Sequence, residues 1–230
     1  MKQKLVVLTG AGISAESGIQ TFRGAGGLWE GKDIMEVATP EGYAKNPALV
    51  LDFYNQRRKQ LAAVEPNKAH TLLGELEQHF DVAVITQNVD DLHERGGSTK
   101  VLHLHGELKK VRSSVDETLI YDIGTKPVNI GDNCEKGSQL RPHIVWFGEQ
   151  VPAMENAMAV TAAAEIFVVI GTSLQVYPAA SLLYCVDDTI PKYIIDPNIP
   201  DSTTVKNLTK IEAKASNGMA SLWKLLVKDV

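Results

Sequence analysis

The sequence has little of what marks several large classes of protein. It contains only two cysteines, Cys134 and Cys185, in 230 residues, which is too few for a disulfide scaffold and fits a reducing cytoplasm. Its net charge of −5 does not indicate nucleic acid or an anionic membrane as the main partner. No apolar run approaches the ~20 residues of a membrane span, and the first run, at residues 5–8, is shorter than the ~7–15 residues of a signal-peptide core. We therefore expect a cytoplasmic protein with no membrane and no nucleic-acid partner.

The sequence does contain an alternation of short apolar runs and helical patterns. Runs rich in β-branched residues predict fully buried strands at residues 5–8, 82–85, 101–104, 166–170 and 193–195. Helical periodicity lies between them, with prolines or Asn67 at the expected starts near residues 47, 67, 152 and 178, and an amphipathic helix closes the chain. This alternation predicts an α/β fold, a Rossmann-like doubly wound parallel sheet.

Two segments interrupt the alternation. Residues 25–66 form a largely helical excursion, and residues 109–141 are polar and read as a small inserted module. The module offers only two short apolar pieces, so we expect its core to consist of Leu119, Tyr121, Val128 and Ile130. We therefore predict one domain over residues 1–230, with a Rossmann-like core at residues 1–24, 67–108 and 142–230.

The first strand runs into a glycine turn. Gly10, Gly12 and Ala15 fit the pattern G-x-G-x-x-[G/A], in which glycines allow a tight turn and a close approach to phosphate. A dehydrogenase would next show a strand ending in an acid about 20 residues on. Here the chain has four glycines and no buried strand, which disfavours hydride transfer. The segment favours a loop closing over a ligand, with Phe22 as an apolar lid and Arg23 as a phosphate partner; alternatively, Phe22 and Trp29 anchor a surface loop.

Four further stretches share the order and spacing of one known family. They are TQNVDDLHERGG (residues 86–97), LHLHGEL (102–108), LRPHIVWFGE (140–149) and IGTSLQVYPAA (170–180). Together with GAGISAESGIQTFRG (10–24), they closely resemble the sirtuins, over essentially the whole chain. The resemblance implies an NAD-dependent protein-lysine deacylase, with NAD as a co-substrate and acyl-lysine proteins or peptides as partners.

The resemblance also implies an NAD site built from these motifs. Asn88 and Asp90 would contact the nicotinamide end, although either alone could instead cap a helix. Asp196 and Asn198 would meet the adenine ribose, where Asp-Pro-Asn departs from the Asn-x-Glu-like text usual in the family. The implied cofactor-binding residues are Gly10, Ala11, Gly12, Ser14, Ala15, Phe22, Arg23, Trp29, Gln87, Asn88, Asp90, His105, Gly171, Thr172, Ser173, Asp196, Asn198 and Ala215.

His105 matches the general base of the family, which is the histidine that precedes a glycine. A neutral imidazole accepts a proton near pH 7, which suits the activation of a ribose hydroxyl. His103 would share its face if the strand continued. The implied catalytic residues are His105, Asn88 and Asp90, and the products are free lysine, nicotinamide and 2′-O-acyl-ADP-ribose.

Tyr54 and Arg57 lie three residues apart, on one face of a predicted helix. This pair resembles the sirtuin subclass that removes malonyl, succinyl or glutaryl groups, and a guanidinium suits a carboxylate. Arg58 would point elsewhere. The alternative is a core tyrosine and a surface arginine. The substrate peptide would lie as an extra strand between two edges, formed by Val145, Trp146, Phe147 and Gly148 and by Val176 and Tyr177.

The resemblance fails at the structural zinc that sirtuins hold in the inserted module. That site needs four thiolates in tetrahedral geometry, but residues 109–141 contain only Cys134, while Ser113, Asp116 and Lys136 stand where other cysteines are expected. We therefore predict no zinc. Two other functions stay open: an ADP-ribosyltransferase on the same scaffold, and a non-catalytic module that binds NAD or ADP-ribose. The presence of His105, Asn88 and Asp90 favours the deacylase.

Overall fold

A six-stranded parallel sheet forms the centre of the computed structural model, which describes residues 1–20, 28–29, 31–172, 174, 177–199 and 205–227. The strands follow the order β11-β10-β9-β1-β4-β5, and every neighbouring pair is parallel. Their bounds are β1 Lys4–Thr9, β4 Asp81–Thr86, β5 Val101–His103, β9 Ile166–Ile170, β10 Lys192–Ile195 and β11 Leu208–Ile211. The five strands expected from the sequence are confirmed. β11 was not expected, because this edge strand has exposed Thr209 and Lys210 at its centre and no continuous apolar run.

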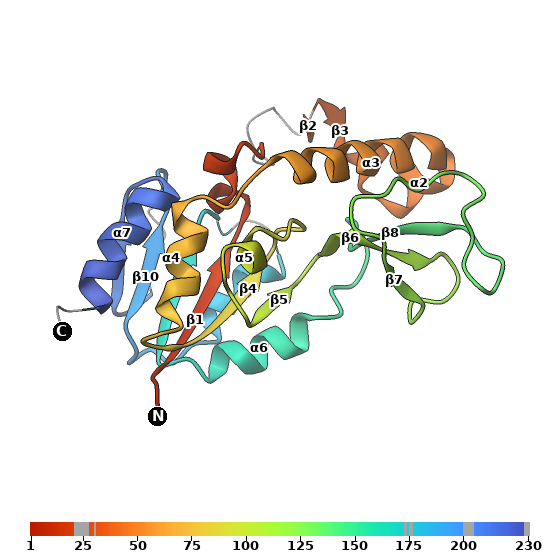
Figure 1. The fold of residues 1–230 in the computed structure, drawn as a ribbon. Coiled ribbons are helices and arrows are strands. Elements are labelled where there is room, and N and C mark those ends of the chain that lie inside the picture. Colours follow the sequence, from red (N-terminus) through yellow and green to blue (C-terminus); the bar gives the residue numbers. More distant parts are fainter. Residues whose placement is uncertain (21–27, 30, 173, 175–176, 200–204, 228–230) are drawn as a thin grey trace.

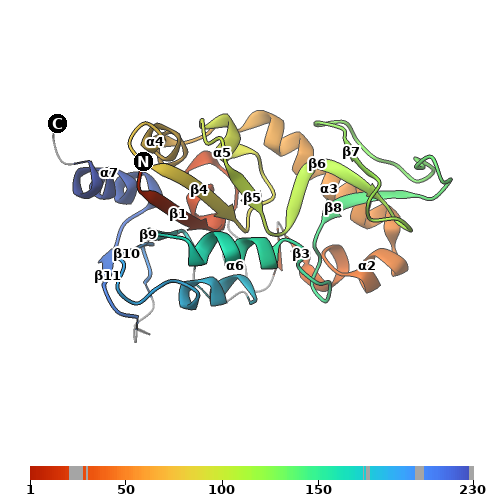
Figure 2. The same cartoon turned by 90° about the horizontal axis from the view of Figure 1, so that it is seen from below.

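Helices cover both faces of this sheet, as a doubly wound fold requires (Figures 1 and 2). In β1, Leu5 and Val7 pack with α4 (Lys68–Leu76) and α7 (Ala215–Leu226). Val6 and Leu8 point to the other face, toward α6 (Met154–Ala162) and a 3-10 helix at Ala179–Tyr184. Successive side chains of a strand alternate between its faces, so an uninterrupted apolar run fills both layers. The helix expected after residue 178 is present, but as a 3-10 helix, which is wound more tightly than an α-helix.

The excursion after β1 is largely helical, as expected. It contains a short hairpin, β2 (Leu28–Trp29) and β3 (Lys32–Asp33), and then α1 (Ile34–Val37), α2 (Pro40–Lys45) and α3 (Pro47–Ala63). Asn46 caps α3 by accepting a hydrogen bond from the Leu49 N–H at 3.1 Å, and Pro47 occupies the first turn. The buried side of α3 forms a third core with the segment after β8.

A second, three-stranded antiparallel sheet lies beside the N-terminal half of α3, away from the parallel sheet (Figure 1). Its order is β7-β6-β8, with bounds β6 Gly106–Ser113, β7 Ile120–Asp122 and β8 Leu140–Ile144. The expected core of the inserted module is partly wrong. Val128 is buried and Tyr121 packs beside it, but Ile130 is 58% exposed and Leu119 lies outside the cluster. The module instead packs on Leu51 of α3, a partner that the module's own sequence does not reveal.

Two further features complete the fold. The helix α5 (Leu92–Arg95) follows β4. In the described ranges, no helix has both the length and the apolar character needed to cross a membrane.

Candidate active site

The turns after β1 and β9 pack backbone against backbone. The Gly10 N–H donates to Ile170 O at 3.0 Å and the Gly12 N–H donates to Gly171 O at 2.8 Å. A Cβ on Gly12 would lie 2.6 Å from Gly171 Cα, and one on Gly10 would lie 2.7 Å from Thr172 Cβ. In the described chain, these glycines thus allow the turn after β1 to lie close to the turn after β9. Ala11 and Ala15 each begin a single 3-10 turn.

Three buried polar side chains meet beneath these turns. Ser14 Oγ donates to Asp90 Oδ2 at 3.1 Å and accepts from Asn88 Nδ2 at 3.1 Å. Asp90 Oδ1 accepts from the Leu92 N–H at 3.2 Å, so one oxygen bonds to the backbone two residues on while the other joins this network. Asp90 is only 5% exposed, and burial raises the pKa of its carboxyl to about 6. The structure therefore brings together two sirtuin motifs that are more than 70 residues apart in the chain.

Two buried histidines that the motif analysis did not select support this network. The Asn67 N–H donates to His70 Nδ1 at 3.3 Å, so a neutral His70 carries its proton on Nε2, 3.5 Å from Ser14 Oγ. His93 Nε2 lies 2.9 Å from Thr9 Oγ1. Burial lowers the pKa of both rings, that of His70 to about 4. The sequence does carry a signal for His70, because Asn67 and His70 form a capping box at the start of α4.

His105 lies in the short connection between the two sheets. Its Nδ1 is 3.0 Å from Gln87 O, and since a carbonyl only accepts, Nδ1 carries the proton and leaves Nε2 of the neutral ring as an acceptor. Burial lowers the pKa of His105, which keeps the ring neutral near pH 7. The Val145 N–H donates to His105 O at 2.9 Å, so the expected peptide-binding edge begins directly beside this histidine.

His103 has a different environment, although it is only two residues away. Its Nδ1 lies 3.0 Å from Asn88 O and its Nε2 lies 2.8 Å from Glu94 Oε1. Burial alone would lower its pKa, but the hydrogen bond and the charge of Glu94 raise it. With both nitrogens engaged, His103 is poorly suited to accept a proton, which agrees with the choice of His105.

Arg57 and Asp90 line one cavity of about 40 Å³. Trp29 also lines it, and the remaining lining residues are Ile19, Gln60, Leu61, Val89 and Leu108. The Arg57 guanidinium carbon lies 5.4 Å from the centre of the Phe53 ring. The cavity thus joins the side chain expected to bind an acyl carboxylate to the carboxyl expected at the nicotinamide end.

Tyr54 is fully buried and does not line this cavity. Its hydroxyl oxygen accepts a hydrogen bond from Trp146 Nε1 at 2.9 Å. The Trp29 ring, which does line the cavity, lies edge-on to Tyr54 with 6.0 Å between ring centres. Arg58 points elsewhere, as expected, and donates from Nε to Leu108 O at 2.8 Å.

The remaining predicted site residues cluster less closely. Gln87 Nε2 donates to Thr172 Oγ1 at 3.1 Å, which links the ends of β4 and β9. Asp196 Oδ1 accepts from the Asn198 N–H at 2.8 Å in a turn after β10. Ala215 is buried in the core at the start of α7, Phe147 and Tyr177 are exposed, and Gly148 has φ +90°. Phe22, Arg23, Ser173 and Val176 lie outside the described residues.

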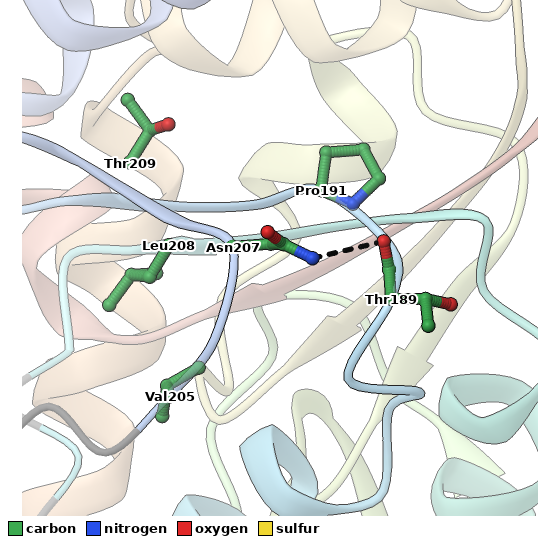
Figure 3. A pocket seen from close by; sticks show the side chains of 6 residues that line it. All are labelled: Thr189, Pro191, Val205, Asn207, Leu208 and Thr209. Atoms are coloured by element: carbon green, nitrogen blue, oxygen red, sulfur yellow. Dashed lines mark hydrogen bonds between the residues drawn. The ribbon is translucent and has the colours of Figure 1, made fainter.

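A larger cavity of about 560 Å³ lies well away from these residues. Figure 3 shows its lining, where Asn207 Nδ2 donates to Thr189 O at 3.1 Å. The other lining residues are Pro191, Val205, Leu208 and Thr209. It lies at the amino ends of β10 and β11, whereas ligands of parallel sheets bind at the carboxyl ends. None of its lining side chains is charged, so we do not assign chemistry to it.

The place of the zinc site in the inserted module is occupied by hydrogen bonds. Ser138 Oγ lies 2.8 Å from Ser113 Oγ and 3.1 Å from Cys134 Sγ, and Lys136 Nζ donates to Asp116 Oδ2 at 2.6 Å. The Ser113 and Ser138 hydroxyls lower the pKa of Cys134 to about 7. A donor set of one thiol, two hydroxyls and an ion pair does not fit a tetrahedral zinc ion. Within the described ranges, no three His, Cys, Asp or Glu side chains are grouped to hold a metal.

Comparisons with known proteins agree with this geometry. A model of the Sir2 family matches residues 10–178. A protein of Helicobacter pylori named NAD-dependent protein deacylase is 54% identical over 98% of this chain and 96% of its own length. A protein of the same name from Bacteroides thetaiotaomicron is 55% identical over 98% of both.

A solved structure shows the same relationship. The complex of a Sir2 homologue with NAD superimposes with a TM-score of 0.87 and 40% identity, covering 98% of this chain and 90% of that one. The resemblance drawn from the five motifs is thereby confirmed. The chain belongs to the Sir2 family.

Proposed function

We propose that this protein is an NAD-dependent protein-lysine deacylase that prefers acidic acyl groups such as succinyl and malonyl. The names of its relatives support the general activity. The acyl preference rests on one observation, that Arg57 and Asp90 line the same cavity. A guanidinium in that position offers paired donors to a carboxylate. An acetyl group has no carboxylate to accept these paired donors.

The buried polar network fits the nicotinamide end of NAD. A carboxamide needs both a donor and an acceptor, and Asn88 and Asp90 supply these from largely buried positions. When bound, NAD supplies an anomeric carbon with a cleavable bond to nicotinamide, and a ribose 2′-hydroxyl. Gln87 would contact the ribose and Thr172 the adenosine side, and the hydrogen bond between these two side chains supports their place in one site. The other motif residues of the predicted NAD site are part of this proposal.

His105 acts as the general base. Its Nδ1–H donates to Gln87 O, so the neutral ring accepts the proton of the 2′-hydroxyl at Nε2. The Gln87 carbonyl holds the ring in this tautomer and also accepts from the imidazolium that forms. The acyl group would pass from lysine to this hydroxyl with the consumption of one water, so the products would be nicotinamide, free lysine and 2′-O-acyl-ADP-ribose.

Matched peptides provide the test. The protein is incubated with NAD and with acetyl-, malonyl- and succinyl-lysine versions of one peptide, and peptide mass and nicotinamide release are followed. We expect malonyl and succinyl to be removed with higher kcat/KM than acetyl, and Arg57→Met to reduce that preference by about tenfold or more. A clear preference for acetyl would contradict the acyl proposal. Absence of all deacylation would contradict the activity, and transfer of ADP-ribose to protein would identify a transferase instead.

We also propose that the chain acts as one catalytic domain without structural zinc. Residues 25–66 supply the lid and the acyl pocket, and residues 109–141 form a module that hydrogen bonds and the contact with α3 stabilise. The low cysteine content supports a cytoplasmic location.

A further inference from the structure

The side chain of Trp146 links the peptide-binding edge to the acyl pocket. It is 2% exposed, and its Nε1–H donates to the Tyr54 hydroxyl oxygen at 2.9 Å, across 92 positions of the sequence. An indole N–H can only donate, so the tyrosine oxygen must be the acceptor in this bond. The single proton of the Tyr54 hydroxyl is then directed elsewhere. Burial raises the pKa of Tyr54, which keeps this proton in place.

An ion cluster holds Trp146 from two sides. Glu149 Oε2 accepts from the backbone N–H of Trp146 at 2.8 Å, and Glu149 Oε1 accepts from Arg141 NH1 at 2.7 Å. The Arg141 guanidinium carbon in turn lies 3.4 Å from the centre of the Trp146 ring. A cation over the face of an indole is attractive, so one glutamate fixes both the backbone and, through Arg141, the ring of Trp146.

Arg112 ties this cluster to the three-stranded sheet. Its NH2 lies 3.3 Å from Glu149 Oε1, and the side chains of Arg112, Arg141 and Glu149 are 6%, 11% and 19% exposed. Burial raises the pKa of Glu149, but hydrogen bonds from Arg141 and the Trp146 N–H and the charges of both arginines lower it more, so that it stays ionised. Charge pairs this poorly solvated hold a defined geometry better than exposed ones.

We propose that Glu149 is a positioning residue for acyl-group recognition: it fixes Trp146, whose indole N–H orients the Tyr54 hydroxyl as a donor toward the carboxylate of the acyl group. The proposal rests on the preference for acidic acyl groups. Arg57 lies one helical turn beyond Tyr54 on α3, and the Trp29 ring, whose centre is 6.0 Å from that of Tyr54, lines the same cavity as Arg57. A carboxylate accepts the Tyr54 proton, whereas the methyl of an acetyl group does not, so orientation of this hydroxyl contributes to selectivity.

The test compares Glu149→Gln with the wild type, using kcat/KM for succinyl- and acetyl-lysine peptides. The amide keeps an oxygen for the Trp146 N–H but loses the charge that holds Arg141. We expect the ratio of succinyl to acetyl kcat/KM to fall about fivefold, mainly through a higher KM for the succinyl peptide. Tyr54→Phe is expected to lower the ratio by as much or more. The double variant should fall no further than Tyr54→Phe, because both changes act on one hydroxyl.

Glu117→Gln is the matched control. Glu117 lies 3.7 Å from the same Arg112 but is 75% exposed, so the identical substitution there should leave the ratio unchanged. The proposal would be refuted if the ratio of succinyl to acetyl kcat/KM fell in both Glu149→Gln and Glu117→Gln. It would also be refuted if the effects of Glu149→Gln and Tyr54→Phe on this ratio were fully additive. An unchanged ratio in folded Glu149→Gln would refute it as well.

Two further measurements separate the possible failures. If wild-type protein shows no preference for succinyl, the acyl preference itself is wrong. The indole N–H resonance of Trp146, assigned by its loss in Trp146→Phe, reports the coupling without substrate: it should shift in Glu149→Gln and not in Glu117→Gln. If Glu149→Gln does not fold, Arg141→Lys, which keeps the charge but not the flat contact over the indole, must give the same fall in ratio.

Discussion

At the scale of single residues, two histidines of one motif have different surroundings. Glu94 engages the second nitrogen of His103 and raises its pKa, while burial lowers the pKa of His105. A general base must be neutral and have an acceptor nitrogen within reach of the hydroxyl. The neutral His105 ring keeps Nε2 as an acceptor, which supports the proposal that His105 is the base.

Replacement of His105 by alanine is expected to lower kcat/KM about 10²- to 10⁴-fold, the usual contribution of a general base. His103→Gln should lower it far less. Nicotinamide release at saturating NAD measures both. In the wild type, kcat/KM should decline as the pH falls through the lowered pKa of His105, which lies below 6.5. A larger loss in His103→Gln than in His105→Ala would contradict the assignment.

Burial of the ionised carboxyl of Asp90 lowers the stability of the folded state. Burial raises the pKa of its carboxyl from 3.8 to about 6, so the folded state binds this proton more tightly than the unfolded state. Between pH 4 and 6 the stability contribution of this group therefore falls as the pH rises, and above pH 6 it stays at its lowest.

Asp90→Asn is accordingly expected to raise the free energy of unfolding at pH 7 by about 1 kcal/mol while reducing deacylation strongly. The gain should shrink toward zero below about pH 3, where the wild-type carboxyl is protonated in both states because the pH lies below both pKa values. Urea unfolding at about pH 3, 5.5 and 7 measures it. A variant that is less stable than the wild type at pH 7 would show that the hydrogen bonds of the ionised carboxylate outweigh its desolvation.

At the scale of elements, hydrogen bonds and packing stabilise the inserted module. The Ser113–Ser138–Cys134 chain and the Asp116–Lys136 pair lie where the sequence resemblance led us to expect zinc ligands. The pairing of β6 with β7 and β8 and the packing of Val128 on Leu51 supply the remaining stability.

Purified protein is therefore expected to contain far less than one zinc per chain, and a chelator should leave Tm unchanged. Ser138→Ala removes the central hydroxyl and should lower the free energy of unfolding by about 1 kcal/mol. Elemental analysis and thermal unfolding with and without chelator measure these outcomes. Stoichiometric zinc, or a large fall in Tm on chelation, would overturn this account.

At the scale of the whole molecule, the candidate active site lies where the chain passes from one sheet to the other. β5 ends at His103 in the parallel sheet and β6 begins at Gly106 in the antiparallel one, with His105 in between. Gly106 has φ +81°, and a Cβ there would lie 2.0 Å from His143 O. Only glycine fits this crossing between the sheets.

Gly106→Ala is expected to destabilise the protein severely, by more than about 3 kcal/mol, because positive φ and a backbone clash act together. Gly124→Ala is the matched control, since Gly124 has φ +59° but no neighbour within 4 Å of the added Cβ. It should cost about 1–2 kcal/mol from backbone strain alone. Thermal and urea unfolding compare the two, and equal losses would mean that the contact between β6 and β8 tolerates the added atom.

The sequence by itself determined the parallel sheet and most of the candidate site. Fully buried parallel strands read as continuous apolar runs, so five strands were predictable, and motif spacing identified His105, Asn88 and Asp90. These features depend on residues close together in the chain, whose pattern sets burial and periodicity directly.

Only the tertiary structure decided the rest. It showed that the glycine turn packs on the turn after β9, that Ile130 is exposed while Leu51 completes the core of the module, and that Trp146 donates hydrogen bonds to both Glu149 and Tyr54. Most of these contacts join segments far apart in the sequence. No local pattern encodes such contacts, because they depend on how whole elements pack against one another.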